Sequence, residues 1–225
     1  MILEACISTK NGLIHAQEFN IPRIELCENL SLDGLTPSIV FQKKANHIFK
    51  GEKFIMIRPH ANGFNYNKKD VITMIKSIES AKENGAEGVV FGALKNKTID
   101  FKVNSQLLEK AKNLGLKCTF HKAIDQCEKL TESIIEISEM GFDWVLTSGK
   151  EINAEKGLNN LKSIVNIRNR KVKILAGGGV SVVNCLLFIN IGIDGLHFSI
   201  DKAGEIETEK FKFILEKLKA THLTK

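Results

Sequence analysis

The sequence has little of what export, a membrane span or a linker between domains would require. It contains three prolines among 225 residues and no long stretch rich in serine, proline and glycine. No basic segment precedes the first apolar residues, so no secretory signal is expected. The longest apolar stretch, residues 172–190, is interrupted by three glycines, which argues against a membrane span. We therefore expect a single domain over residues 1–225 and no membrane partner.

Cysteine is present, but its arrangement does not predict disulfides. The five cysteines are an odd number, lie far apart and form no Cys-X-X-Cys motif. In a chain without an export signal, this predicts free thiols in a reducing compartment and hence a cytoplasmic location.

Arginine is scarce, although the chain is basic. The net charge is +6 and the pI is about 9.0, but only four of the 32 basic residues are arginine. The lysines are scattered, and no dense basic run alternates with aromatic residues. A nucleic-acid partner is therefore not expected.

What the sequence does contain is a repeated βα unit. Gly85, Gly115, Gly141 and Gly192 each follow a helical pattern and precede a short apolar run, at steps of 30, 26 and 51 residues, the last step being two units. The apolar runs predict eight strands, at residues 2–7, 23–27, 53–57, 88–91, 117–120, 144–147, 173–176 and 195–197. Amphipathic helices are expected between the strands, including one at 68–84, and a last helix at 207–219. Eight such units favour a parallel (β/α)8 TIM-type barrel over an open doubly wound sheet, which would need fewer strands.

In such a barrel, functional residues lie at the carboxyl ends of the strands. Alternation places Glu4 and Cys6 on one face of the first strand, and Arg23, Glu25 and Cys27 on one face of the second. Charged strand residues need solvent or a polar partner. We therefore expect a buried polar cluster, which either serves a functional site or is an ion-paired network that fills the barrel.

The two strand-end cysteines suggest a metal site. Adjacent strands lie about 4.7–4.9 Å apart, so the thiols of Cys6 and Cys27 could hold one soft ion such as Cu(I). The alternative is that both are small core residues. Cys127, shortly after the fifth predicted strand, is the most plausible additional thiol near this face.

Histidines and glycines at other strand ends suggest a second chemistry. His121 ends the fifth strand and His197 the eighth, and either could act as an acid or base. Asp125 could orient His121 or cap the next helix. Gly177, Gly178, Gly179 and Ser199 follow the seventh and eighth strands, where barrels of this type bind phosphate, although the glycines could instead form a tight turn.

Several of these motifs, taken in order, resemble the CutC family of copper homeostasis proteins along nearly the whole chain. They are Leu3–Cys6, Arg23–Cys27, Gly34–Ser38, Ile57–Pro59, Phe120–Ala123, Val145–Gly149, Ala176–Val180 with Asn184, and His197. The resemblance implies a TIM-type barrel, a cytoplasmic location, homo-oligomers and copper handling, with Cu(I) bound through Cys6 and Cys27.

The chain also departs from the family pattern at two motifs. The family's Arg-Gly-Gly-Asp-Phe after the third strand is replaced by residues 60–64, His-Ala-Asn-Gly-Phe, so an arginine and an acid are missing. The family's His-Arg-Ala-Phe-Asp is replaced by residues 121–125, His-Lys-Ala-Ile-Asp. Lysine cannot bind an anion in the bidentate manner of arginine, so binding of an anionic ligand is expected to be weaker or different.

Three functions follow from the residues and the resemblance. The first is a copper homeostasis protein that binds Cu(I) through Cys6 and Cys27. The second is an enzyme that acts on a small anionic or phosphorylated metabolite, with His121 or Glu25 as the acid or base. Arg58 would bind the negative charge of the substrate, and His197 would lie beside the reacting centre. The third is a scaffold that has kept the barrel and lost its site.

Overall fold

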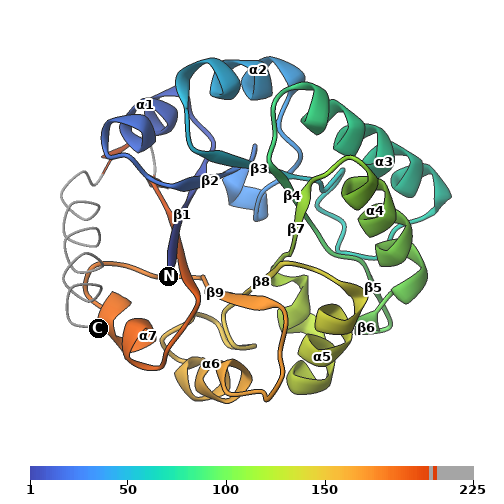
Figure 1. Ribbon diagram of the computed structural model, residues 1–225, viewed down its shortest axis with the longest axis vertical. Coiled ribbons are helices and arrows are strands. Elements are labelled where there is room, and N and C mark those ends of the chain that lie inside the picture. Colours follow the sequence, from blue (N-terminus) through green and yellow to red (C-terminus); the bar gives the residue numbers. More distant parts are fainter. Residues whose placement is uncertain (203–204, 207–225) are drawn as a thin grey trace.

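The computed structural model describes residues 1–202 and 205–206, and their main feature is a closed barrel of eight parallel strands (Figure 1). Around the barrel the strands are ordered β1-β10-β9-β8-β7-β4-β3-β2, so β1 pairs with β10 and closes the ring. The barrel strands are β1 (Ile2–Ile7), β2 (Arg23–Leu26), β3 (Glu52–Met56), β4 (Gly88–Phe91), β7 (Lys117–Phe120), β8 (Trp144–Thr147), β9 (Lys173–Ala176) and β10 (Gly195–Ser199).

Helices cover the outside of the barrel (Figure 1). They are α1 (Lys10–Glu18), α2 (Ile39–Ile48), α3 (Lys68–Glu83), α4 (Phe101–Asn113), α5 (Leu130–Met140), α6 (Leu158–Val165) and α7 (Cys185–Asn190). Two short 3-10 helices, η1 (Leu30–Leu32) and η2 (Lys122–Gln126), follow β2 and β7. None of the helices in the described part of the chain combines the length and apolar character needed to cross a bilayer.

The predicted (β/α)8 barrel is confirmed, strand by strand. Five of the eight strands have the predicted bounds, and the other three differ by one or two residues at an end. Two small hairpins, β5 (Leu94–Lys95) with β6 (Thr98–Ile99) and β11 (Asp201–Lys202) with β12 (Glu205–Ile206), were not predicted, because strands of two residues carry no periodicity. The helix predicted at 207–219 lies outside the described residues.

Local sequence explains how the helices start and stop. Asn67 and Asp70 form a reciprocal capping box at the start of α3, and Val71, Met74 and Ile78 face the barrel. Gly141 ends α5 in the left-handed conformation, with φ of 95°. This is the helix-ending role that the glycine spacing predicts.

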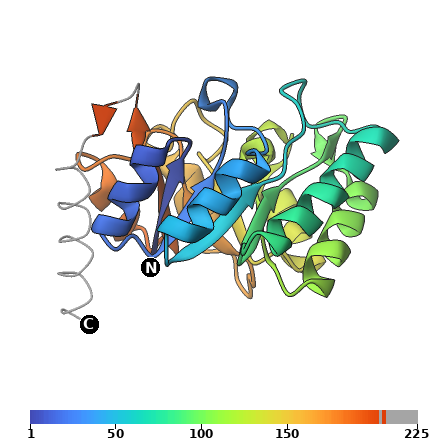
Figure 2. The same ribbon diagram turned by 90° about the horizontal axis from the view of Figure 1, so that it is seen from above.

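Apolar side chains fill two separate regions. The larger core lies between the strands and the helices, while a smaller cluster with Phe54, Met56, Trp144 and Leu175 fills the barrel interior. Figure 2 shows the barrel from the side, with the N-terminus at its lower edge and the β11–β12 hairpin at its upper edge. The upper edge is the carboxyl end of the strands. It is therefore the end where function is expected.

One buried amide fixes the segment between β4 and α4. Asn104 in α4 accepts a hydrogen bond from the backbone N–H of Ala93 (2.9 Å) and donates to the carbonyls of Ala93 and Asp100 (2.8 Å each). Both Asn104 and Ala93 are fully buried. The Asn104 side chain therefore pairs backbone groups that water cannot reach.

We predict that Asn104→Ala lowers the free energy of unfolding by roughly 1–3 kcal/mol, because the buried N–H of Ala93 loses its partner, whereas the Ala93 carbonyl keeps the hydrogen bond from the N–H of Asp100. The matched control is Asn113→Ala, at the exposed end of the same helix, which should change it by less than about 0.5 kcal/mol. Urea unfolding of both variants measures the difference. Equal losses in the two variants would contradict this role of Asn104.

Candidate metal centre and its cavity

A cavity of about 620 Å³ opens at the carboxyl ends of the strands. Most residues predicted for the site line it: Cys6, Glu25, Cys27, Arg58, His121, Gly178, Gly179, His197 and Ser199. Gly177 does not. A side chain there would lie 2.5 Å from Leu146 and 3.3 Å from His197, so this glycine allows close packing below the cavity.

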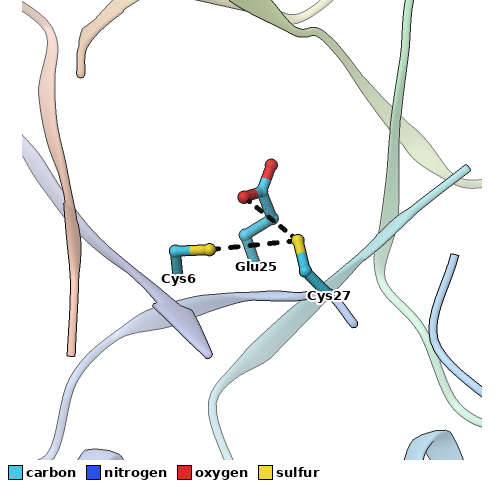
Figure 3. A group of neighbouring side chains, drawn as sticks. All are labelled: Cys6, Glu25 and Cys27. Carbon is cyan, nitrogen blue, oxygen red and sulfur yellow. Dashed lines mark hydrogen bonds between the residues drawn. The ribbon is translucent and has the colours of Figure 1, made fainter. Parts of the chain in front are cut away.

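Two thiols and a carboxyl group lie together on one side of the cavity floor (Figure 3). Cys6 is the penultimate residue of β1 and lies opposite Glu25 of β2, and Cys27 follows directly after β2. The sulfurs of Cys6 and Cys27 are 3.9 Å apart, and Glu25 Oε2 is 3.5 Å from Cys27 Sγ. All three side chains are buried, and their ligand atoms lie within 4.8 Å of one another. Among the described residues, this is the group that could hold a metal ion.

A buried ion pair supports the thiol pair from below. The Arg23 Nε atom lies 2.6 Å from Glu4 Oε2, and neither side chain has any exposed surface. The guanidinium of Arg23 stacks between the rings of Phe54 and Trp144, at 4.4 and 4.3 Å from their centroids. Cation–π contacts of this kind are strongest where water is excluded.

Glu4 in turn positions a histidine from the other end of the chain. Its Oε1 atom lies 2.8 Å from His197 Nδ1 in β10, the strand paired with β1. The other ring nitrogen, Nε2, lies 3.6 Å from Glu25 Oε2. A carboxylate on one nitrogen of a histidine fixes the ring and directs the other nitrogen, here toward the thiols.

The two thiols differ in acidity. A hydrogen bond from Cys27 lowers the pKa of Cys6, and although burial opposes this, contact with His197 adds to it and the pKa falls to about 6. The pKa of Cys27 is raised well above its ordinary value, because its hydrogen bond to Cys6, its burial and the negative charge of Cys6 all favour the protonated form. At neutral pH the pair therefore holds one thiolate and one thiol.

The pKa values of the neighbouring groups Glu25, His197 and Glu4 are also shifted, and in different directions. Burial and the adjacent Cys6 thiolate raise the pKa of Glu25 well above its ordinary value, so Glu25 holds a proton. Burial disfavours a charge on His197, but Glu25, Cys6 and Glu4 together raise its pKa well above its ordinary value. Burial also opposes ionisation of Glu4, yet Arg23 and His197 outweigh it and lower the pKa of Glu4.

The opposite side of the cavity carries Arg58 and His121. His121 follows β7, which lies four strands from β1 in either direction around the barrel. Arg58 Nη1 donates to the carbonyls of Leu32 (2.6 Å) and Gly34 (3.0 Å). The Phe64 ring contacts both the Arg58 guanidinium (4.9 Å) and the His121 ring (4.8 Å, tilted by 56°), so it links the two side chains.

Two sequence predictions about this region are wrong. Asp125 neither orients His121 nor caps a helix. Its carboxylate instead accepts hydrogen bonds from the hydroxyl groups of Thr147 and Ser148 and from the backbone N–H groups of Ser148 and Lys150. Cys127 does not line the cavity but packs in the core between barrel and helices. The positions of Asp125 and Cys127 depend on the path of the short helix η2, which strand periodicity does not determine.

Sequence reasoning missed two features of the site. The stacking of Arg23 between Phe54 and Trp144 was not predicted, although all three occupy inward positions of neighbouring or facing strands. Lys122 was also missed as a cavity residue. Its ammonium nitrogen would lie 3.3 Å from a Cβ atom at Gly178, so the glycine leaves room for it.

Comparison with known proteins gives a consistent family match. The family model described as CutC family matches residues 1–202. A family protein CutC of Aliivibrio fischeri (strain MJ11) is 40% identical over 219 residues, covering 96% of this chain and 87% of the relative. One from Bacteroides fragilis (strain ATCC 25285) is 38% identical over 201 residues, covering 88% of this chain and 79% of the relative.

A solved structure agrees with these relatives. The CutC protein of Streptococcus agalactiae, to which copper homeostasis is ascribed, superimposes with a TM-score of 0.81 at 30% identity. The match covers 88% of this chain and 97% of that one.

We predict that Cys6 reacts with iodoacetamide in the copper-free protein with a midpoint near pH 6, because its thiolate is stabilised by Cys27 and His197. His197→Gln should move the midpoint upward, whereas His60→Gln, which alters a histidine paired with Asp70, should not. Mass spectrometry of the Cys6 peptide over a pH series measures the midpoint. A midpoint near the ordinary cysteine value in the unmodified protein would contradict the charge assignment.

Proposed function

We propose that this chain, which belongs to the CutC family, is a copper homeostasis protein that binds Cu(I) as cargo between the thiolates of Cys6 and Cys27. The observation that carries the proposal is the 3.9 Å separation of two buried cysteine sulfurs that line a cavity open at one end of the barrel. Metal–thiolate bonds of about 2.3 Å, as in zinc sites, allow one ion to contact both sulfurs at this separation.

The chemistry of the donors suits a soft monovalent ion. Thiolates select Cu(I), whereas carboxylate oxygens suit harder cations. Glu25 is the carboxyl group within reach, and its raised pKa keeps it protonated and a poor ligand. The thiols therefore bind, and Glu25 remains a hydrogen-bonding neighbour.

Charge balance supports the same cargo. In the copper-free cluster the positive charges of Arg23 and His197 match the negative charges of Glu4 and Cys6, with Glu25 neutral. Loss of the Cys27 proton would leave one uncompensated negative charge in a buried site. One Cu(I) ion supplies one positive charge, so the buried cluster is neutral before and after binding.

Binding of Cu(I) by two thiolates requires a reducing compartment. Thiols that bind copper must stay reduced, and all five cysteines are free, which fits the cytoplasm. Copper would be buffered or transferred without turnover of a substrate. The homo-oligomers implied by the family resemblance remain a prediction.

We predict that binding of Cu(I) at neutral pH releases about one proton per ion, because Cys6 is already a thiolate and Cys27 is not. Calorimetry in buffers of different ionisation enthalpy, under anaerobic conditions, measures the number. Release of two protons would mean that Cys6 is protonated in the copper-free protein and would contradict the predicted charge balance.

We further predict that the Cys6→Ser/Cys27→Ser double variant loses more than about a hundredfold in Cu(I) affinity, since loss of outer-shell partners alone costs roughly 10–100-fold in metal sites. Anaerobic titration against a competing chelator measures it. Cys118→Ala is the matched control, because this buried cysteine packs in the outer core, and it should bind Cu(I) like the parent. Binding that survives in the double variant would refute the site.

A further inference from the structure

The cavity is much larger than a copper site needs. If each non-hydrogen atom takes about 30 Å³, the volume of one water molecule in the liquid, the 620 Å³ cavity accommodates roughly 20 of them. Volumes of this size are typical of sites for small organic molecules. Much of the lining is apolar, with side chains of Leu30, Met56, Leu146, Val180 and Phe198. The thiol pair occupies only one side of this space.

The other side, which we call the cationic wall, consists of Arg58, His121 and Lys122. His121 is 3% exposed, and its Nδ1 atom accepts a hydrogen bond from the N–H of Ala123 (3.3 Å). In the neutral ring the proton is then on Nε2. Burial and the charge of Arg58 lower the pKa of His121 to about 3, so the ring stays neutral at physiological pH.

Two donors of the cationic wall are buried and unpaired. The Nε2 atom of His121 and the Nε atom of Arg58 have no hydrogen-bond partner among the described residues, although both side chains line the cavity. An unpaired buried donor costs free energy. A ligand acceptor that reached either atom would remove the cost at that atom.

Two members of the cationic wall are held in place before any ligand binds. Two backbone carbonyls hold Arg58 Nη1, and the Phe64 ring contacts both Arg58 and His121. Gly178 has no side chain, which leaves space for the ammonium group of Lys122, an exposed residue. The fixed guanidinium of Arg58 and the neutral donor of His121, with the Lys122 charge beside them, favour binding of an anion.

The acidic residues near the cationic wall do not cancel its charge. Asp33 and Glu151 line the cavity and are exposed to solvent, as Lys122 is, so solvent screens these three charges, whereas Arg58 is buried. The Asp125 carboxylate is occupied by Thr147, Ser148 and Lys150. Glu25 is buried beside the thiols, with its Oε2 atom 3.5 Å from Cys27 Sγ.

We propose that the cationic wall binds the oxyanion, a carboxylate or a phosphate, of a small organic ligand whose apolar part fills the cavity beside the thiol pair. The site does not depend on the copper function, because none of its three residues is a thiol ligand. It adjoins the thiol pair at Gly34, whose carbonyl accepts from Arg58 and where a Cβ atom would lie 3.2 Å from the Cys27 sulfur. A bound ligand would thus cover the thiols from the solvent side.

The test uses copper-free, reduced protein and calorimetric titration with inorganic phosphate, phenyl phosphate, malonate and benzylmalonate. One anion class should bind, and its phenyl or benzyl form should bind more tightly than the simple anion, because the apolar lining contributes. Lys122→Ala should weaken binding roughly tenfold or more, as expected for loss of a bond between charged groups. Lys156→Ala, which removes an exposed lysine that does not line the cavity, should leave it within about twofold.

A second readout reports on His121 itself. NMR spectra of protein with isotope-labelled histidine should show the Nε2–H signal of His121. This signal should persist at mildly acidic pH and shift when the anion that binds is added. His121→Phe, which keeps a ring against Phe64, should abolish this signal and weaken anion binding while Cu(I) titration still gives the parent affinity. The proposal is overturned if no probe binds the folded parent, if Lys122→Ala and Lys156→Ala weaken binding equally, or if the phenyl and benzyl groups give no gain.

Discussion

The buried pair of Glu4 and Arg23 is the interaction on which the candidate site depends. Two charges inside a barrel are costly unless each is fully compensated, and here Arg23 is compensated by a carboxylate at 2.6 Å and by two aromatic faces. Glu4 is thereby held as a carboxylate and keeps a proton on His197, which stabilises the Cys6 thiolate. The acidity of Cys6 thus depends first on its neighbour Cys27 and further on this buried chain of contacts, through which Phe54 and Trp144 reach the thiol.

The cavity separates two kinds of chemistry on opposite sides of one barrel. Strands β1, β2 and β10 supply soft sulfur donors together with a histidine that carries a proton. The loops after β3 and β7 supply hard donors with fixed positive charge, and their histidine is neutral. The two histidines differ because His197 faces carboxyl groups and a thiolate, whereas His121 faces a guanidinium group.

Features of the fold and the site that depend on local sequence were predictable, whereas features that depend on contacts between distant segments were not. The strands and the thiol pair were predictable, because glycine spacing gives the βα repeat, and the repeat places Cys6 and Cys27 at neighbouring strand ends. The role of Asp125 and the position of Cys127 were not, because Asp125 lies in η2 and Cys127 directly follows it, and the path of η2 is set by contacts with the next strand and its loop. The contacts of Phe64 with Arg58 and His121 join two separate loops, and no local sequence pattern predicts them.

The contact between Glu4 and His197 joins residues 193 positions apart, across the pairing of β1 with β10. During synthesis the first two strands, with both cysteines, leave the ribosome long before His197 exists. Until β10 joins β1, the thiols lack the histidine that adds to the acidity of Cys6. The full acidity of Cys6 therefore requires closure of the ring, because this histidine comes from the last barrel strand to be made.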